Sequence, residues 1–189
     1  MVVSTVTYLE MTSADEIVPA RLPEEPLEIR RVEEISPEFS RFLYASVGGD
    51  WHWTEKLTWT WSRWVEHLSR PGFETWVAWV GGTPAGYIAL KADGTEVEVE
   101  NFGLLPGFIG RGIGGHLLTA GLLHAWTMPD RHPELEPVTR VWLHTNTLDG
   151  PYALANYEAR GLRQYKSVDE ERPDADGPPP GPWPGAERP

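Results

Sequence analysis

The segment with the most chemical information is a glycine-rich turn between a predicted strand and an apolar helix. Four glycines fall within six positions: Gly110, Gly112, Gly114 and Gly115. Without a Cβ, such a backbone folds tightly and turns several N–H groups into one space, where they bind an anion. The helix that follows adds its unpaired N–H groups and the positive end of its dipole, which favours a pyrophosphate. We expect Arg111 to add a charge-assisted contact.

Three other interpretations of this segment are weaker. A tight strand-to-helix connection needs only one or two glycines. No Gly-Lys-Ser or Gly-Lys-Thr is present, which excludes a P-loop. The glycine spacing also matches a dinucleotide fingerprint, but that motif requires an acid at the end of the next strand, about 20 residues on. Here Glu134 and Glu136 lie in a proline-broken loop, so a dinucleotide-dependent oxidoreductase is disfavoured.

The elements that must position this turn follow from periodicity and from breaker residues. Apolar runs bounded by Gly and Pro predict strands at residues 5–11, 27–32, 74–80, 84–91, 95–104, 138–145 and 162–168. Helical spacing and capping residues predict helices at about residues 36–48, 60–69, 112–126 and 151–160. In the second helix we expect one stripe facing the core, made of Trp61, Trp64, Val65 and Leu68. Together these elements predict an α+β fold, with a central mixed, mostly antiparallel twisted sheet of six to seven strands flanked by about four helices.

Composition limits the domain organisation and the chemistry. A length of 189 residues with 40% hydrophobic content suits a single domain, which we assign to residues 1–168. Residues 169–189 are rich in Pro, Gly and acid, and they predict a disordered tail. The chain has no cysteine, which excludes disulfides and covalent mechanisms through sulfur. Its six histidines lack metal-binding spacing, so we expect no metal.

Charge and hydropathy limit the partners. The formal charge of −12 argues against nucleic acid and anionic membranes, and it would attract a cationic substrate, although acidic surfaces more often serve solubility. The first ten residues lack the basic region of a signal peptide, and the longest charge-free stretch, residues 112–128, is too short to cross a membrane. We therefore expect a cytoplasmic protein. Exposed strand edges would also allow a homodimer.

Two motifs together resemble the GNAT N-acetyltransferase superfamily over roughly residues 95–165. The first is a strand, then Pro106, then Gly-x-Gly-x-Gly at the head of a helix. The second is the strand that begins at Arg140, followed by a helix that carries Tyr157 near its end and then by Gly161-Leu162. The resemblance implies the GNAT-like fold, acetyl-CoA as cofactor, and direct transfer of an acetyl group to a primary amine in a ternary complex.

The resemblance also implies where the cofactor binds. The backbone amides of residues 109–114 would hold the CoA pyrophosphate, and the strand near residues 102–104 would pair with the pantetheine arm. Asn146 and Asn156 would bind the pantetheine amides, or else cap and pack. The expected cofactor-binding residues are Phe102, Gly103, Leu104, Ile109, Gly110, Arg111, Gly112, Ile113, Gly114, Gly115, Asn146 and Asn156.

Acetylation of an amine requires a base, polarisation of the thioester carbonyl and a proton for the leaving thiolate. We favour Glu98 as the base, because it lies where several members of the resembled superfamily carry a catalytic glutamate, and because it shares a strand face with Glu100. Glu100 is the second choice, His144 is a further acid/base candidate, and water is an alternative. We favour Tyr157 as the acid, from its matching position in the superfamily. The structural alternatives are a solvated strand face and a packing tyrosine.

The acceptor is expected beside the connection between the first two helices, since that connection borders the acceptor in the resembled superfamily. Trp51, His52 and Trp53 would line the site, or the tryptophans would anchor the loop. A small molecule, an amino acid or a protein lysine all remain as acceptors. The alternative function is a catalytically silent acyl-CoA-binding module of the same fold, which would keep the glycines but would not need Glu98 or Tyr157.

Overall fold

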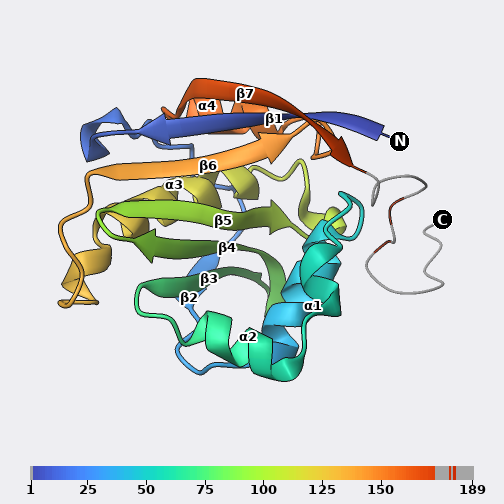
Figure 1. Cartoon of the computed structure of the whole chain (residues 1–189), viewed down its shortest axis with the longest axis horizontal. Coiled ribbons are helices and arrows are strands. Elements are labelled where there is room, and N and C mark those ends of the chain that lie inside the picture. The colour runs from blue at the N-terminus through green and yellow to red at the C-terminus, as the bar shows by residue number, and fades with distance from the viewer. Residues whose placement is uncertain (1, 173–178, 180, 182–189) are drawn as a thin grey trace.

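The structure is a computed structural model that describes residues 2–172 together with residues 179 and 181. Its strands are β1 (Val2–Met11), β2 (Glu28–Arg31), β3 (Phe73–Val80), β4 (Thr83–Asp93), β5 (Glu96–Leu104), β6 (Arg140–Asn146) and β7 (Arg163–Arg172). Its α-helices are α1 (Pro37–Gly48), α2 (Trp61–Leu68), α3 (Ile113–Trp126) and α4 (Ala153–Ala159). The strands form one seven-stranded sheet in the order β2-β3-β4-β5-β6-β1-β7 (Figure 1).

The sheet is mixed, as the sequence predicts. The β5–β6 pair is parallel, whereas the other neighbouring pairs are antiparallel. The first strand lies between the last two, because β1 pairs with β6 on one edge and with β7 on the other. β7 continues to Arg172, four residues beyond the predicted end at Val168. The remainder of the predicted tail, apart from Pro179 and Gly181, lies outside the described residues.

Two helix starts have side-chain caps, of which the one at Ser36 was predicted. The hydroxyl of Ser36 accepts a hydrogen bond from the N–H of Phe39 (3.2 Å), and Thr60 caps α2 in the same way. The predicted stripe on α2 is wrong at Trp61, which is 61% exposed. As the first residue of the helix, Trp61 turns toward α1 and donates its indole N–H to Glu38 (3.0 Å).

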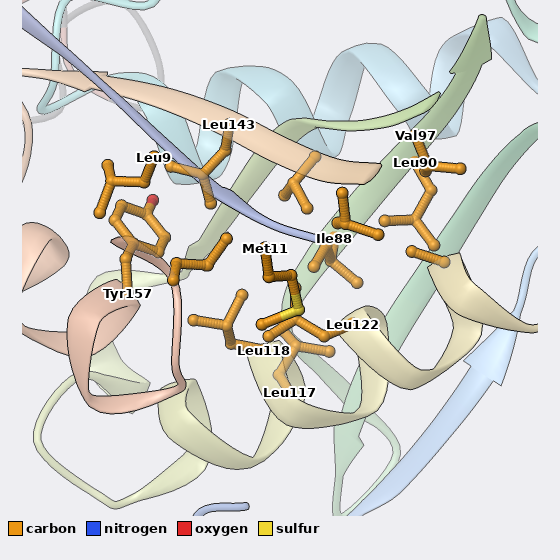
Figure 2. Packing of buried hydrophobic residues seen from close by; sticks show 14 of the residues in the cluster. Leu9, Met11, Ile88, Leu90, Val97, Leu117, Leu118, Leu122, Leu143 and Tyr157 are labelled. Carbon is orange, nitrogen blue, oxygen red and sulfur yellow. The ribbon is translucent and has the colours of Figure 1, made fainter. Parts of the chain in front are cut away.

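Helices cover the two faces of the sheet with separate hydrophobic clusters. α3 and α4 pack on one face, where Leu117, Leu118 and Leu122 are fully buried against strand residues such as Ile88 (Figure 2). α1 packs on the other face, where Leu43 and Val47 contact strand residues of β3 and β4. Truncating such a buried leucine to alanine typically costs about 2–5 kcal/mol. Packing on both faces therefore stabilises the sheet that carries the central strands β5 and β6.

β5 is distorted in two ways that open the sheet. It pairs in parallel with β6 only over Glu96–Glu98, and beyond that point the two strands separate. On its other side, the register with β4 shifts: Ala89 is opposite Asn101, but Leu90 is opposite Val99. Glu100 is therefore the extra residue of a β-bulge, which bends the strand. The opening between β5 and β6 is where the cavity described next begins.

Candidate active site

One cavity of about 830 Å³ connects most of the sequence-predicted residues. One wall is β5 from Glu98 to Leu104, and the facing wall includes Leu143, His144 and Asn146 of β6. The glycine-rich turn and the connection between α1 and α2 also line it. The split between the two strands thus brings the predicted phosphate site and the predicted acceptor site into a single space.

The glycine-rich turn has the backbone geometry that only glycine adopts readily. Gly110 and Gly112 have positive φ angles of 83° and 76°, and Gly112 is the residue that caps α3. A Cβ at either position would meet no atom within 4 Å, so the backbone there faces open space. Ile109, Gly110, Gly112, Gly114 and Gly115 line the cavity. Backbone N–H groups at a helix start in open space fit a pyrophosphate.

Two of the predicted cofactor residues point elsewhere. The guanidinium of Arg111 binds Glu25 (Nε to Oε1, 2.7 Å) and does not line the cavity. The side chain of Ile113 is fully buried in the core, which leaves its backbone as the part available to a ligand. The sequence alone does not reveal the Arg111 pair, because Glu25 is 86 residues away in the chain.

The predicted pantetheine residues lie along the middle of the cavity. Phe102, Gly103 and Leu104 line it from β5, on the stretch that β6 does not pair. The Asn156 side chain lines it from α4 and lies against the glycines, with its Oδ1 3.5 Å from the Cβ position of Gly115. Asn146 also lines the cavity, but its Oδ1 accepts the N–H of Leu148 (2.8 Å) and so holds the turn after β6.

Glu98 is buried at the point where β5 and β6 separate. Its carboxylate is 10% exposed, with Oε2 2.6 Å from Lys91 Nζ and Oε1 3.7 Å from His144 Nδ1. Lys91 is the direct cross-strand partner of Glu98 on β4. His144 follows Trp142, the parallel partner of Glu98, by two residues, so it faces the same side of the sheet. The carboxylate is thus fixed between an ammonium and an imidazole at the cavity wall.

Glu100, the bulge residue, has a different environment. Its Oε2 accepts hydrogen bonds from Lys56 Nζ (2.5 Å) and His67 Nε2 (2.9 Å), and Lys91 lies 3.5 Å from its Oε1. Burial raises its pKa, but these hydrogen bonds and the positive charge of Lys56 outweigh burial and lower it to about 2. Glu100 is therefore a fixed anion near neutral pH.

Tyr157 lies at the end of the core, where the cavity begins. Its ring packs beside Leu9 and Leu143 (Figure 2) and makes an edge contact with Phe102 (5.9 Å between centroids). Burial, followed by the negative charge of Asp149, raises its pKa well above the usual phenol value. The hydroxyl therefore keeps its proton at neutral pH, as a proton donor must.

The part of the cavity wall that follows α1 is aromatic. Trp51, His52 and Trp53 all line it, in the segment after α1. Trp53 packs on Tyr44 (5.4 Å between centroids), while the Trp51 ring lies in contact with Gly150, 3.5 Å from the position of a Cβ there. His52 has a positive φ of 58°, which is uncommon for a residue with a side chain. The loop thus lines the cavity and is also anchored by Trp53, whereas binding of an acceptor there stays a prediction.

The sequence interpretation missed the cations of this site. Lys56, at the 3₁₀ turn η2 (Glu55–Thr58), hydrogen-bonds Glu100 and Asn101, and its ammonium lies near the rings of Tyr44 and Trp59 (5.7 and 5.4 Å). The pairing of Lys91 with Glu98 could have been predicted from the sequence, because both residues belong to the same hairpin. The predicted strand ends would have paired Lys91 near Thr95, whereas the hairpin closes at Asp93–Glu96.

Comparisons with known proteins agree with this geometry. A family model described as "Acetyltransferase (GNAT) family" matches residues 31–162. A GCN5-related N-acetyltransferase from Kribbella flavida is similar in structure, with a TM-score of 0.60, 15% identity, and coverage of 87% of this chain and 56% of that one. One from Sphaerobacter thermophilus has a TM-score of 0.57 and 18% identity, with 87% and 50% coverage. This chain thus spans about half the length of those two structures.

A shorter structure is covered more fully. It is an aminoglycoside acetyltransferase from an uncultured soil metagenomic sample in complex with sisomicin, with a TM-score of 0.53, 16% identity, and coverage of 71% of this chain and 86% of that one. No curated protein matches the chain in sequence. Within the described residues, no helix has the length and apolar character to span a bilayer, and no three potential ligands gather as a metal site.

Proposed function

The chain belongs to the GNAT acetyltransferase family, and from this premise we propose that it is an acetyl-CoA-dependent N-acetyltransferase that transfers the acetyl group directly to a primary amine. The observation that carries the proposal is the continuity of the cavity. It joins the glycine turn, where backbone N–H groups suit a pyrophosphate, to a buried carboxylate and an aromatic wall. A donor and an acceptor bound in this one cavity would both have access to Glu98 and Tyr157.

Groups of this chain would bind CoA at its pyrophosphate and along its pantetheine arm. The N–H groups of residues 109–114 would bind the pyrophosphate, and the edge of β5 near residues 102–104, which β6 does not pair, would bind the pantetheine. Asn156 offers an amide beside the glycines. When bound, acetyl-CoA supplies an acetyl group activated as a thioester. Arg111 has no part in this proposal, because Glu25 engages it.

The proton steps are assigned to two residues. Glu98 takes a proton from the acceptor amine, so that the nitrogen can form the new C–N bond. The Tyr157 hydroxyl supplies the proton that the sulfur takes up as the C–S bond breaks. Glu100 is not the base in this proposal, because a carboxylate with a pKa of about 2 is too weakly basic to deprotonate an ammonium. Acceptors with an apolar body suit the walls formed by Trp51 and Trp53.

The first experiment is calorimetric titration with acetyl-CoA, followed by measurement of free CoA release with a panel of primary amines. We expect binding, together with release for some amines. Gly112→Val tests the cradle, because a β-branched residue at a φ of 76° is strained and caps α3 poorly. Its matched control is Gly107→Ala, at an ordinary φ where a Cβ meets nothing.

The outcomes separate the alternatives. Weaker binding in Gly112→Val, with Gly107→Ala unchanged, supports the cradle. Binding without release for any amine would favour the silent acyl-CoA-binding module over the enzyme. If acetyl-CoA does not bind at all, the assignment of the glycine turn is wrong.

A further inference from the structure

The two oxygens of the Glu98 carboxylate have different partners. Oε2 lies 2.6 Å from Lys91 Nζ, and the bulge residue Glu100 shares the same ammonium at 3.5 Å. Burial lowers the pKa of Lys91, but the hydrogen bond and charge of Glu98 outweigh it and raise the pKa above its ordinary value. Lys91 therefore stays an ammonium and cannot take a proton. Oε1, by contrast, faces the ring of His144.

Of the two described side chains that form ion-pair contacts with Glu98, Lys91 already carries its proton, whereas a neutral His144 ring has a nitrogen that can accept one. Its Nδ1 lies 3.7 Å from Glu98 Oε1, a distance that substrate binding commonly shortens in acid–base pairs. Its ring contacts Tyr8 (5.8 Å) on β1 and Trp142 (6.3 Å) on its own strand, and the ammonium of Lys166 on β7 lies 4.7 Å from the centre of the Tyr8 ring. The side chain is 46% exposed, whereas that of Glu98 is 10% exposed.

We propose that His144 relays the proton of the acceptor amine from Glu98 to bulk water. This inference rests on the proposed function. The N–H bond of the attacking amine breaks as the C–N bond forms, and its proton goes to Glu98 Oε1. That proton then passes to His144 Nδ1, and the imidazolium releases the proton on Nε2 to solvent. Exchange with water restores the starting tautomer, so Glu98 is again a carboxylate for the next turnover.

His144→Phe and His144→Ala test the relay. Phenylalanine keeps the aromatic contact with Tyr8 but has no nitrogen, and we expect kcat to fall about 10- to 100-fold with CoA affinity unchanged, at the lower end of general acid–base effects. In His144→Ala, added imidazole should restore turnover in proportion to its free-base concentration. Tyr8→Phe is the matched control, since it keeps the ring beside His144 and removes a hydroxyl only; its turnover should equal that of the wild type.

A second measurement does not depend on turnover. In ¹⁵N NMR spectra, Glu98→Gln should change the Nδ1 resonance of His144, because the facing carboxylate is lost. An unchanged resonance would show that the ring does not engage Glu98 and would overturn the relay. So would a wild-type rate in His144→Phe, or a slow His144→Ala variant that imidazole does not rescue. Absence of turnover in the wild type with every amine would instead count against the proposed function.

Discussion

Two clusters of charged residues lie on opposite faces of the sheet and use similar side chains. The active-site cluster, on the α1 face, consists of Lys56, His67, Lys91, Glu98, Glu100 and His144. The Glu74 cluster, on the α3 face, consists of Arg31, Glu74, Trp76, Arg131 and His132. Each surrounds buried carboxylates with cations, so residue type alone does not separate them.

What differs is whether the carboxylate has an oxygen left for other chemistry. Both oxygens of Glu74 are saturated: Arg131 binds them at 2.8 and 2.9 Å, and Trp76 and His132 add bonds of 2.8 and 3.1 Å. The side chain is 1% exposed and does not line the active-site cavity. Glu98 has one oxygen bound and the other at the cavity wall. A closed cluster stabilises the fold, and an open one can exchange protons with a ligand.

The comparison is tested most strongly by Glu74→Gln. Removing the charge leaves Arg131 without its bidentate partner, and we expect a loss of about 3–5 kcal/mol in the free energy of unfolding, with kcat per folded molecule unchanged. Urea unfolding measures the loss of stability. Steady-state rates divided by the concentration of active sites give kcat per folded molecule. Glu28→Gln, in the exposed Glu28–Arg30 pair, is the control and should cost under about 0.5 kcal/mol. Equal losses in the two variants would contradict the structural role of the Glu74 cluster.

Glu98→Gln should have the opposite profile. We expect kcat/KM to fall about 10³-fold, most steeply at low pH where the amine requires deprotonation, with little change in unfolding free energy. Steady-state rates across pH provide the measurement. Glu96→Gln is the matched control, because Glu96 lies on the same strand but pairs with Arg140 outside the cavity. A normal rate in Glu98→Gln would move the base to His144 or to water.

Acid should weaken the active-site cluster through Glu100. Its pKa is about 2 in the folded protein against an ordinary 4.5, so the stabilisation is complete above about pH 5 and is lost as the pH falls toward 2. The shift corresponds to about 3 kcal/mol. Glu100→Gln should remove this contribution to the pH dependence of the unfolding free energy. The contribution of Glu74, whose pKa is also lowered, should remain. Urea unfolding at pH 7, 5 and 3 measures how the free energy of unfolding depends on pH. The same dependence in the wild type and in Glu100→Gln would exclude a contribution from Glu100.

The smallest expected effect belongs to Tyr157→Phe. The ring stays in the core, so stability should change by less than about 1 kcal/mol, while kcat falls about tenfold because water must supply the proton. Stopped-flow CoA release measures the rate, and calorimetry should give an unchanged Kd for CoA. If kcat is also unchanged, Tyr157 only packs α4 onto the sheet.

Local features of this chain could be predicted from its sequence. The caps Ser36 and Thr60, the apolar periodicities and the glycines at positive φ each depend on residues close together in the chain. Such features specify dihedral angles and short hydrogen bonds, which neighbouring residues control. The sequence by itself therefore determined the mixed α+β fold and the glycine turn. The candidates Glu98, Tyr157 and Trp51–Trp53, which line the cavity, came from the resemblance to the superfamily.

Only the tertiary structure decided how these candidates are partnered. The insertion of β1 between β6 and β7, the bulge at Glu100 and the Arg111–Glu25 pair all join residues that periodicity treats separately. A bulge shifts the register by one residue, and register decides which side chains meet across strands. The difference between Glu98, with an oxygen facing His144, and Glu100, held by Lys56 and His67, arises from that shift and from helix packing, neither of which the local sequence specifies.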